Sequence, residues 1–155
     1  MRPVSNLDQP DPRPGVLRLL IVEDEISTVF AMREFFSFTG YQVDCAAGTA
    51  EATLLLERNR YDVVITDLHL TPNRCAEGMG ILACARSLSP HALIVMLTAY
   101  ASEGSEREAY SGGVNLYETK PVGLAELAAR IEAARNNSPS ARPRTGGEWG
   151  GACPQ

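Results

Sequence analysis

Five short strand-like runs, separated by segments with helical periodicity, occupy the middle of this chain. Three of them are strongly apolar, the run at 114–118 is weaker, and the run at 41–46 carries polar residues. Short, nearly continuous apolar runs are typical of strands buried on both faces. Strands that alternate with helices predict a parallel sheet with helices on both faces, joined by right-handed crossovers. We therefore expect an α/β protein with a doubly wound five-stranded parallel sheet. The runs are Leu17–Val22, Tyr41–Ala46, Asp62–Asp67, Ala92–Leu97 and Val114–Glu118.

The segments between these runs carry apolar residues at helical spacing. The second has Ala52, Leu55 and Leu56 on its expected buried side, and the last repeats Leu124, Leu127, Ala128 and Ile131 at intervals of three and four. Gly40 is an expected helix stop, and Gly112-Gly113 an expected turn. We predict helices at Ile26–Thr39, Thr49–Arg58, Met79–Leu88 and Ser102–Ser111, with a final helix opened by Pro121.

Length and charge limit the class of protein. A chain of 155 residues with 45% hydrophobic composition forms one ordinary domain with a sizeable core. Its net charge of −5 offers no electrostatic footprint for nucleic acid or an anionic membrane. We find no apolar stretch of the roughly 20 residues that span a bilayer, and no signal-peptide core. We expect a cytoplasmic protein that binds neither nucleic acid nor membrane.

Proline-rich segments flank this domain. Residues 1–15 contain four prolines and few apolar residues, which indicates a flexible arm. Residues 138–155 have the same character and predict a disordered tail. The folded domain is therefore expected to span 16–137.

Four cysteines occur along the chain, namely Cys45, Cys75, Cys84 and Cys153. Their spacing contains no Cys-x-x-Cys unit, and neither histidine completes a zinc pattern. We expect reduced, unrelated thiols, with Cys84 facing an interior packed by helices.

Polar groups follow four of the five apolar runs. The third run ends at Asp67, the first leads into Glu23-Asp24-Glu25, the fourth into Thr98 and the fifth into Lys120. Ligands of open α/β sheets bind outside the carboxyl ends of the strands. If the strands are parallel, these groups converge on one site around Asp67.

Carboxylates brought together in this way repel one another, and a hard divalent cation such as Mg²⁺ removes the conflict. An acidic triplet after a strand is also a common way to place negative charge at a helix N-terminus, and both roles can coexist. Lys120 supplies either a compact charge for a phosphoryl group or a structural ion pair with Asp67 or Asp24. Thr98 is either a donor to a phosphoryl oxygen or a strand-terminating residue.

Taken in order, Ile21-Val-Glu-Asp-Glu25, Val63-Val-Ile-Thr-Asp67, Ile94-Val-Met-Leu-Thr-Ala99 and Leu116-Tyr-Glu-Thr-Lys-Pro121 resemble the receiver domain of two-component response regulators. The resemblance covers residues 16–137 and implies the strand order 2-1-3-4-5. A chemotaxis response regulator is itself a standard example of this fold.

The resemblance implies a role for each matching position. Asp67 would accept a phosphoryl group from a histidine kinase or phosphotransfer protein. Glu23 and Asp24, with Asp67 and the backbone carbonyl of His69, would hold Mg²⁺, with Mn²⁺ as a substitute. Lys120 and Thr98 would bind phosphoryl oxygens.

Further positions would control the switch and the lifetime of the phosphoryl group. Thr98 and Tyr117 would form the conformational switch, although Tyr117 could equally be an ordinary strand aromatic. His69 and Tyr100 would tune dephosphorylation, and we hypothesise that the bulk of Tyr100 slows it. His69 could also be an ordinary exposed loop residue.

The loop after Asp67 departs from the family pattern. The family usually has a proline four residues after the phosphoacceptor, whereas Pro72 is five residues on, and Glu77-Gly78 stands where an Asp-Gly pair is usual. This lengthening leaves the conformation of the loop open.

Two other functions compete with this interpretation. One is a receiver-like module that binds proteins without phosphorylation. The other is a phosphatase of the haloacid-dehalogenase type, which Thr66-Asp67-Leu-His69-Leu-Thr71 loosely resembles, although His69 replaces the general acid. We expect a stand-alone receiver that is not a multiple-turnover enzyme. Its output would pass to a downstream protein or to a homodimer through the face between the fourth and fifth helices.

Overall fold

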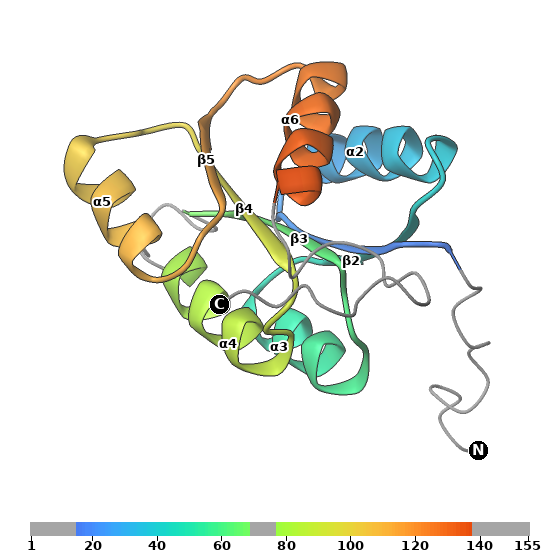
Figure 1. The fold of residues 1–155 in the computed structure, drawn as a ribbon, viewed down its shortest axis with the longest axis horizontal. Helices are drawn as coiled ribbons and strands as arrows, with labels where there is room; N and C mark the ends of the chain where they lie inside the picture. The colour runs from blue at the N-terminus through green and yellow to red at the C-terminus, as the bar shows by residue number, and fades with distance from the viewer. Residues whose placement is uncertain (1–14, 69–76, 138–155) are drawn as a thin grey trace, which may run out of the picture.

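The computed structural model describes residues 15–68 and 77–137, and the fold within them is a five-stranded parallel sheet between two layers of helices (Figure 1). The strands are β1 (Arg18–Val22), β2 (Gln42–Ala46), β3 (Val63–Asp67), β4 (Leu93–Thr98) and β5 (Leu116–Thr119). The helices are α2 (Ile26–Phe38), α3 (Thr49–Arg58), α4 (Glu77–Leu88), α5 (Glu103–Ser111) and α6 (Leu124–Asn137). The predicted arms at 1–14 and 138–155 lie outside the described residues.

The strand order is β2-β1-β3-β4-β5, and every neighbouring pair is parallel. This confirms the predicted doubly wound sheet and its order. The chain moves outward from β1 to β2, then crosses back over β1 to β3. The carboxyl ends of β1 and β3 therefore lie side by side at the switch point of the sheet.

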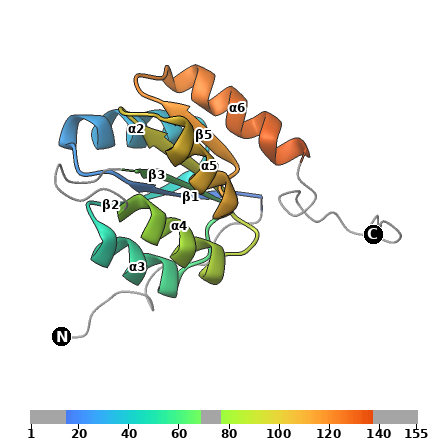
Figure 2. The same cartoon turned by 90° about the vertical axis from the view of Figure 1, so that its left-hand side faces the viewer.

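Alternate strand residues face opposite helical layers, as the two-residue period of a strand requires. In β1, Leu20 and Val22 pack on the side of α3 and α4, while Leu19 and Ile21 pack toward α2 and α6. Figure 2 shows α2 and α6 on one face of the sheet and α3 and α4 on the other. Both faces are apolar because both are covered, which explains the continuous apolar runs of the sequence.

The helices differ in how firmly they are buried. On α3, Ala52 and Leu56 are buried and Leu55 is partly buried, as predicted. On α5 only Ala109 is buried, and the helix lies beside β5 at the edge of the molecule (Figure 1). The many polar residues of this short helix are consistent with that peripheral position.

The predicted start of the last helix is wrong. Pro121 was expected to open it, but α6 begins at Leu124, and its first backbone hydrogen bond joins Leu127 N to the Gly123 carbonyl. Pro121 and Val122 instead form a connecting segment that lays Val122 against the core on the α2 side. Tertiary packing of Val122 outweighs the preference of proline for the first turn of a helix.

Two of the four cysteines lie in the described residues. Cys45 and Cys84 are free, and Cys84 packs partly buried against the α3 and α4 core, as expected. Cys75 and Cys153 lie outside the described residues. Among the described helices, none is long and apolar enough to cross a bilayer.

Candidate functional site

Asp67 and Lys120 form the centre of the site. Asp67 is the last residue of β3 and only 7% exposed, and Lys120 comes directly after β5. The Lys120 ammonium lies 2.9 Å from Asp67 Oδ2 and 3.0 Å from Glu23 Oε1. One lysine thus bridges two buried carboxylates whose strands both end at the same edge of the sheet.

A third carboxylate joins these two. One oxygen each of Glu23, Asp24 and Asp67 lies within 4.8 Å of the others. Glu23 and Asp67 are buried and Asp24 is exposed, so the cluster is open to solvent on one side. Three converging carboxylate oxygens are the hard donors that a divalent cation such as Mg²⁺ accepts, and an open side leaves room for water or phosphate oxygens. The residues therefore fit a metal.

Burial and charge oppose each other in this cluster. Burial raises the pKa of Glu23 above its ordinary value, although the bond and charge of Lys120 offset part of the rise. Burial alone would lower the pKa of Lys120, but its bonds to Asp67 and Glu23 outweigh that effect and raise it. The ammonium is thus held in its charged form by the carboxylates that it neutralises.

The members of the acidic triplet Glu23-Asp24-Glu25 make different contacts. Glu25 is the N-cap residue of α2, and its carboxylate accepts hydrogen bonds from the hydroxyls of Ser27 at 3.4 Å and Thr28 at 2.9 Å. Glu23 turns into the cluster and accepts a bond from the Glu25 backbone N–H at 3.2 Å. The helix-start role and the carboxylate cluster therefore fall to different members of the triplet.

Thr98 is fully buried at the end of β4. Leu97 is the register partner of Asp67, which places Thr98 one residue beyond it. The Thr98 hydroxyl accepts a bond from the Tyr100 backbone N–H at 3.0 Å, and its carbonyl accepts one from Lys120 N at 2.8 Å. The Tyr100 side chain is 76% exposed beside this strand end. The fold thus ties the threonine and the lysine together through the backbone.

Tyr117 is the second residue of β5 and is buried, and it belongs to the same core cluster as Ala109 and Val114. Its hydroxyl is hydrogen-bonded to Ser105 Oγ in the first turn of α5. Sequence reasoning identified Tyr117 but missed Ser105, because a serine in a polar helix carries no signal until its partner is known.

Gly78 is a second residue whose close approach to the end of β3 could not be inferred from the sequence. A Cβ placed on it would lie 2.5 Å from the Asp67 carbonyl oxygen and 2.7 Å from Leu68 Cα. The backbone of α4 can approach the end of β3 this closely only without a side chain. Gly78 N also donates to the Leu68 carbonyl at 3.1 Å. His69, predicted as a metal ligand through its carbonyl and as a tuning residue, lies outside the described residues.

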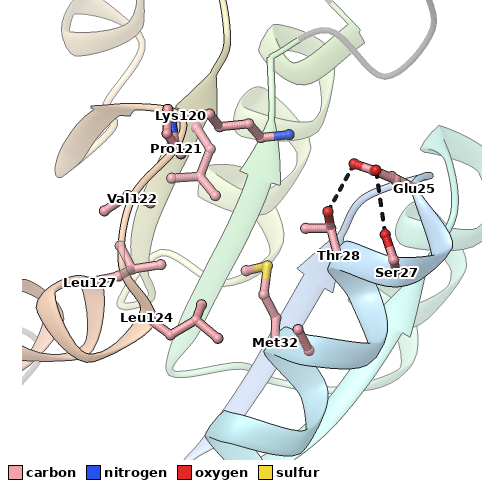
Figure 3. A pocket seen from close by; sticks show the side chains of 11 residues that line it. Glu25, Ser27, Thr28, Met32, Lys120, Pro121, Val122, Leu124 and Leu127 are labelled. Atoms are coloured by element: carbon pink, nitrogen blue, oxygen red, sulfur yellow. Dashed lines mark hydrogen bonds between the residues drawn. The ribbon is translucent and has the colours of Figure 1, made fainter.

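A groove of about 330 Å³ adjoins the site between α2 and α6. Figure 3 shows side chains that line it: Glu25 and Met32 on the α2 side, Lys120 after β5, and Leu124 and Leu127 of α6. Lys120 and Glu25 are the charged residues that line this groove, and most of its other lining residues are apolar, so Lys120 is the residue that joins the groove to the carboxylate cluster.

The strand order and the cluster of carboxylates and lysine at the carboxyl ends of the strands are the features expected of a receiver domain. A family model of the response regulator receiver domain matches residues 19–132. The chain belongs to this family, which confirms the resemblance found in its motifs. The solved structures agree: a CheY-like receiver domain protein from Methanospirillum hungatei JF-1 superposes with a TM-score of 0.71 at 28% identity, covering 77% of this chain and 93% of that one.

Another similar structure is a Burkholderia pseudomallei response regulator described with a phosphorylated aspartic acid, a calcium ion and citrate. It has a TM-score of 0.69 at 26% identity and covers 79% of this chain and 75% of its own.

The curated relatives align with this chain along about half of their own length. Response regulator MprA of Mycobacterium sp. (strain KMS) is 33% identical over 128 residues, which is 82% of this chain and 54% of MprA. The transcriptional regulatory protein PhoP of Escherichia coli O157:H7 is 32% identical over 123 residues, which is 79% of this chain and 54% of PhoP. This chain thus spans about half the length of these relatives.

Proposed function

We propose that this receiver domain accepts a phosphoryl group on Asp67 from a histidine kinase or phosphotransfer protein and signals through the resulting change in conformation. The observation that carries this proposal is the ion pair between Asp67 and Lys120 inside the carboxylate cluster. An isolated strand-end aspartate would be a poor phosphoryl acceptor. Asp67 is held rigidly, partly screened from water, and has the neutralising charge already in place.

The transfer itself needs few groups. A carboxylate oxygen of Asp67 attacks the donor phosphorus as the bond from phosphorus to the donor imidazole nitrogen breaks, and the imidazole keeps the bonding electron pair. Lys120 would move its ammonium from the carboxylates to a phosphoryl oxygen, and Thr98 would turn its hydroxyl from the Tyr100 amide toward another; their present contacts with Asp67 and the Tyr100 amide support these roles. Catalysis is then mainly positioning and electrostatics.

A divalent cation fits the same proposal. Glu23, Asp24 and Asp67 would hold Mg²⁺, or Mn²⁺ in its place, and the cation would neutralise charge on the transferred group. Mg²⁺ at ten times its dissociation constant should stabilise the fold by about 1.4 kcal/mol. Thermal unfolding should show this gain in the wild type and lose most of it in Asp24→Asn. Glu25→Gln, which removes the same charge one residue away, should keep it, and an equal loss in both variants would contradict the site.

Mass spectrometry after incubation with Mg²⁺ and acetyl phosphate tests the central proposal. One phosphoryl adduct should form on the wild type and on the control Asp62→Asn. The Asp62 side chain lies just before β3, at the other end of that strand from Asp67, and accepts a bond from Arg18 N in the wild type. Asp67→Asn should remain unlabelled. No adduct on any form would support a module that works without phosphorylation. Repeated turnover of small phosphomonoesters would support the phosphatase instead, so the proposal is of a phosphoacceptor and not a multiple-turnover enzyme.

The lifetime of the phosphoryl group should depend on Tyr100. Its exposed side chain follows Thr98 closely, where it can restrict the approach of water to Asp67. Tyr100→Ala should shorten the phosphoryl half-life several-fold, measured by loss of the adduct over time. Tyr110→Ala, an exposed tyrosine on α5, is the control. An unchanged half-life in Tyr100→Ala would remove this role.

The output of the domain is proposed to pass through protein contacts, either with a downstream partner or with a second copy through the face of α5, β5 and α6. Arg130 on this face donates hydrogen bonds to Glu118 of β5 and Glu126 of α6. These bonds fix the positions of one positive and two negative side chains on the face. PhoP is named a transcriptional regulatory protein, and a similar role for the whole protein here is also a proposal. Sedimentation velocity with and without beryllofluoride would detect the dimer.

A further inference from the structure

The two ends of α5 are attached to the rest of the molecule in different ways. At its C-terminal end, Arg86 of α4 donates to the carbonyls of Pro90, Ala92 and Gly113 and to Asn115 Oδ1, at 2.8–3.0 Å. This arginine joins the end of α4, the start of β4 and the turn between α5 and β5. We call these bonds the Arg86 clamp.

Close packing reinforces the clamped end. A Cβ on Gly112, the C-cap residue that follows α5, would lie 2.9 Å from Leu82 Cδ2 of α4. Asn115 N donates to the Ile94 carbonyl at 2.8 Å, and Asn115 Oδ1 also accepts a bond from Ile94 N at 2.8 Å. The C-terminal end of α5 is thus held by several bonds and by direct contact with α4.

The N-terminal end, which follows Thr98 in the chain, is held differently. Among α5 residues only Ala109 is buried, and the first turn is exposed except for the half-buried Ser105. Ser102 and Ser105 form a reciprocal capping box, in which Ser105 N donates to Ser102 Oγ at 3.0 Å. These bonds are local to the turn. The hydrogen bond of Ser105 to Tyr117 links that turn to the sheet.

We propose that Ser105 is a positioning residue that latches the first turn of α5 to Tyr117, and that α5 pivots on the Arg86 clamp when this latch opens. This inference rests on the proposed phosphoryl switch for its trigger. Thr98 releases the Tyr100 amide when it turns to a phosphoryl group, which removes one of the bonds that hold the segment leading into α5. The single hydroxyl pair then yields before the several bonds at the other end, because local opening begins where fewest contacts must break.

The hydrogen bond between Ser105 and Tyr117 stabilises the arrangement without a phosphoryl group, so its loss should favour the phosphoryl-bound arrangement. Calorimetric titration of the whole chain with beryllofluoride and Mg²⁺ should show about threefold to tenfold tighter binding for Ser105→Ala, the range expected for one hydrogen bond. Ser105→Thr, which keeps the hydroxyl, should restore the wild-type affinity. Ser102→Ala removes the cap without touching Tyr117 and should change the affinity less than twofold.

A double-mutant cycle separates a latch from a general loosening of α5. In the Tyr117→Phe background, Ser105→Ala should no longer alter beryllofluoride affinity. Independent effects of the two changes, or unchanged affinity in Ser105→Ala alone, would overturn the proposal.

Hydrogen exchange tests the pivot without any phosphoryl analogue. Tyr117→Phe leaves the capping box intact, yet it should speed exchange of the Ser105 and Glu106 amides and leave those of Gly113 and Asn115 unchanged. Uniform change along α5, or none, would refute the latch. If the wild type fails to bind beryllofluoride, the proposed function fails, while the exchange pattern still decides the latch.

Discussion

At the scale of single residues, Gly78 shows how the backbone of one element constrains the site on another. The atoms that a Cβ would meet belong to the backbone of Asp67 and Leu68 and cannot move aside as a flexible side chain would. Gly78→Ala should therefore destabilise the fold by about 2 kcal/mol and slow phosphorylation, because the end of β3 must shift.

Gly80, two residues along the same helix, is the matched control. A Cβ there meets nothing within 4 Å, so Gly80→Ala should be neutral or stabilise the fold by up to about 1 kcal/mol, as alanine favours a helix. Urea denaturation of both variants measures the difference. Equal stabilities would show that the end of β3 tolerates a side chain.

Tyr61 gives the fold a pH dependence in the alkaline range. Its hydroxyl is buried and donates to Asp44 Oδ2 at 2.6 Å, and burial together with that carboxylate raises the pKa of Tyr61 well above its ordinary value near 10. The folded state keeps the proton above pH 10, whereas the unfolded chain loses it. This contribution to stability is complete below pH 10 and is lost progressively as pH rises from that value toward the raised pKa of the folded state.

The expected loss between pH 9 and pH 11 is about 1.4 kcal/mol for this one group. Tyr61→Phe cannot ionise, so its stability should fall by that much less over the same range. Urea unfolding of both proteins at the two pH values measures the difference. Parallel pH profiles would mean that the hydroxyl titrates normally in the folded protein.

At the scale of elements, the Arg86 clamp fixes the relation of α4 to the β4 and β5 side of the sheet. Arg86→Met keeps much of the aliphatic stem but removes the donors, which should cost about 2–3 kcal/mol because the carbonyls lose charge-assisted bonds. Arg58 occupies the last turn of α3 and is exposed. Arg58→Met should change stability by less than about 0.5 kcal/mol, and similar losses in the two variants would remove the special role of Arg86.

At the scale of the whole molecule, exposed apolar residues of α2 lie beside the carboxylate cluster, where the proposed protein donor would have to dock. Ile26 and Phe30 are 83% and 57% exposed, and both line a second groove that also includes Asp24 of the carboxylate cluster. A protein donor can cover them, whereas acetyl phosphate cannot.

Ile26→Ser should therefore slow transfer from a phosphorylated phosphotransfer protein several-fold and leave labelling by acetyl phosphate unchanged. Phe38, 90% exposed at the far end of the same helix, supplies the control Phe38→Ser, which should affect neither rate. Adduct formation with each donor is the measurement. Equal slowing with both donors would place the effect in the site itself.

Much of this architecture follows from the sequence because it depends on local pattern. The three central strands could be found from nearly continuous apolar runs, since a strand covered on both faces has no polar side to interrupt it. The edge strands β2 and β5 carry polar residues and give a weaker signal. Asp67, Asp24, Lys120 and Thr98 could be found because parallel strands bring their carboxyl ends together. The start of α6 could not, because packing of Val122 decides it.

The sequence by itself determined the class of fold and the residue types at the strand ends, because periodicity and chemistry are properties of neighbouring residues. Only the tertiary structure decided how those residues share their charges. In it Lys120 pairs with both Glu23 and Asp67, and Glu25 lies at the start of α2. Gly78 lies close to the backbone at the end of β3, and Ser105 is hydrogen-bonded to Tyr117. Each of these contacts joins groups whose distance depends on how the sheet and its helices pack, and no local pattern encodes that distance.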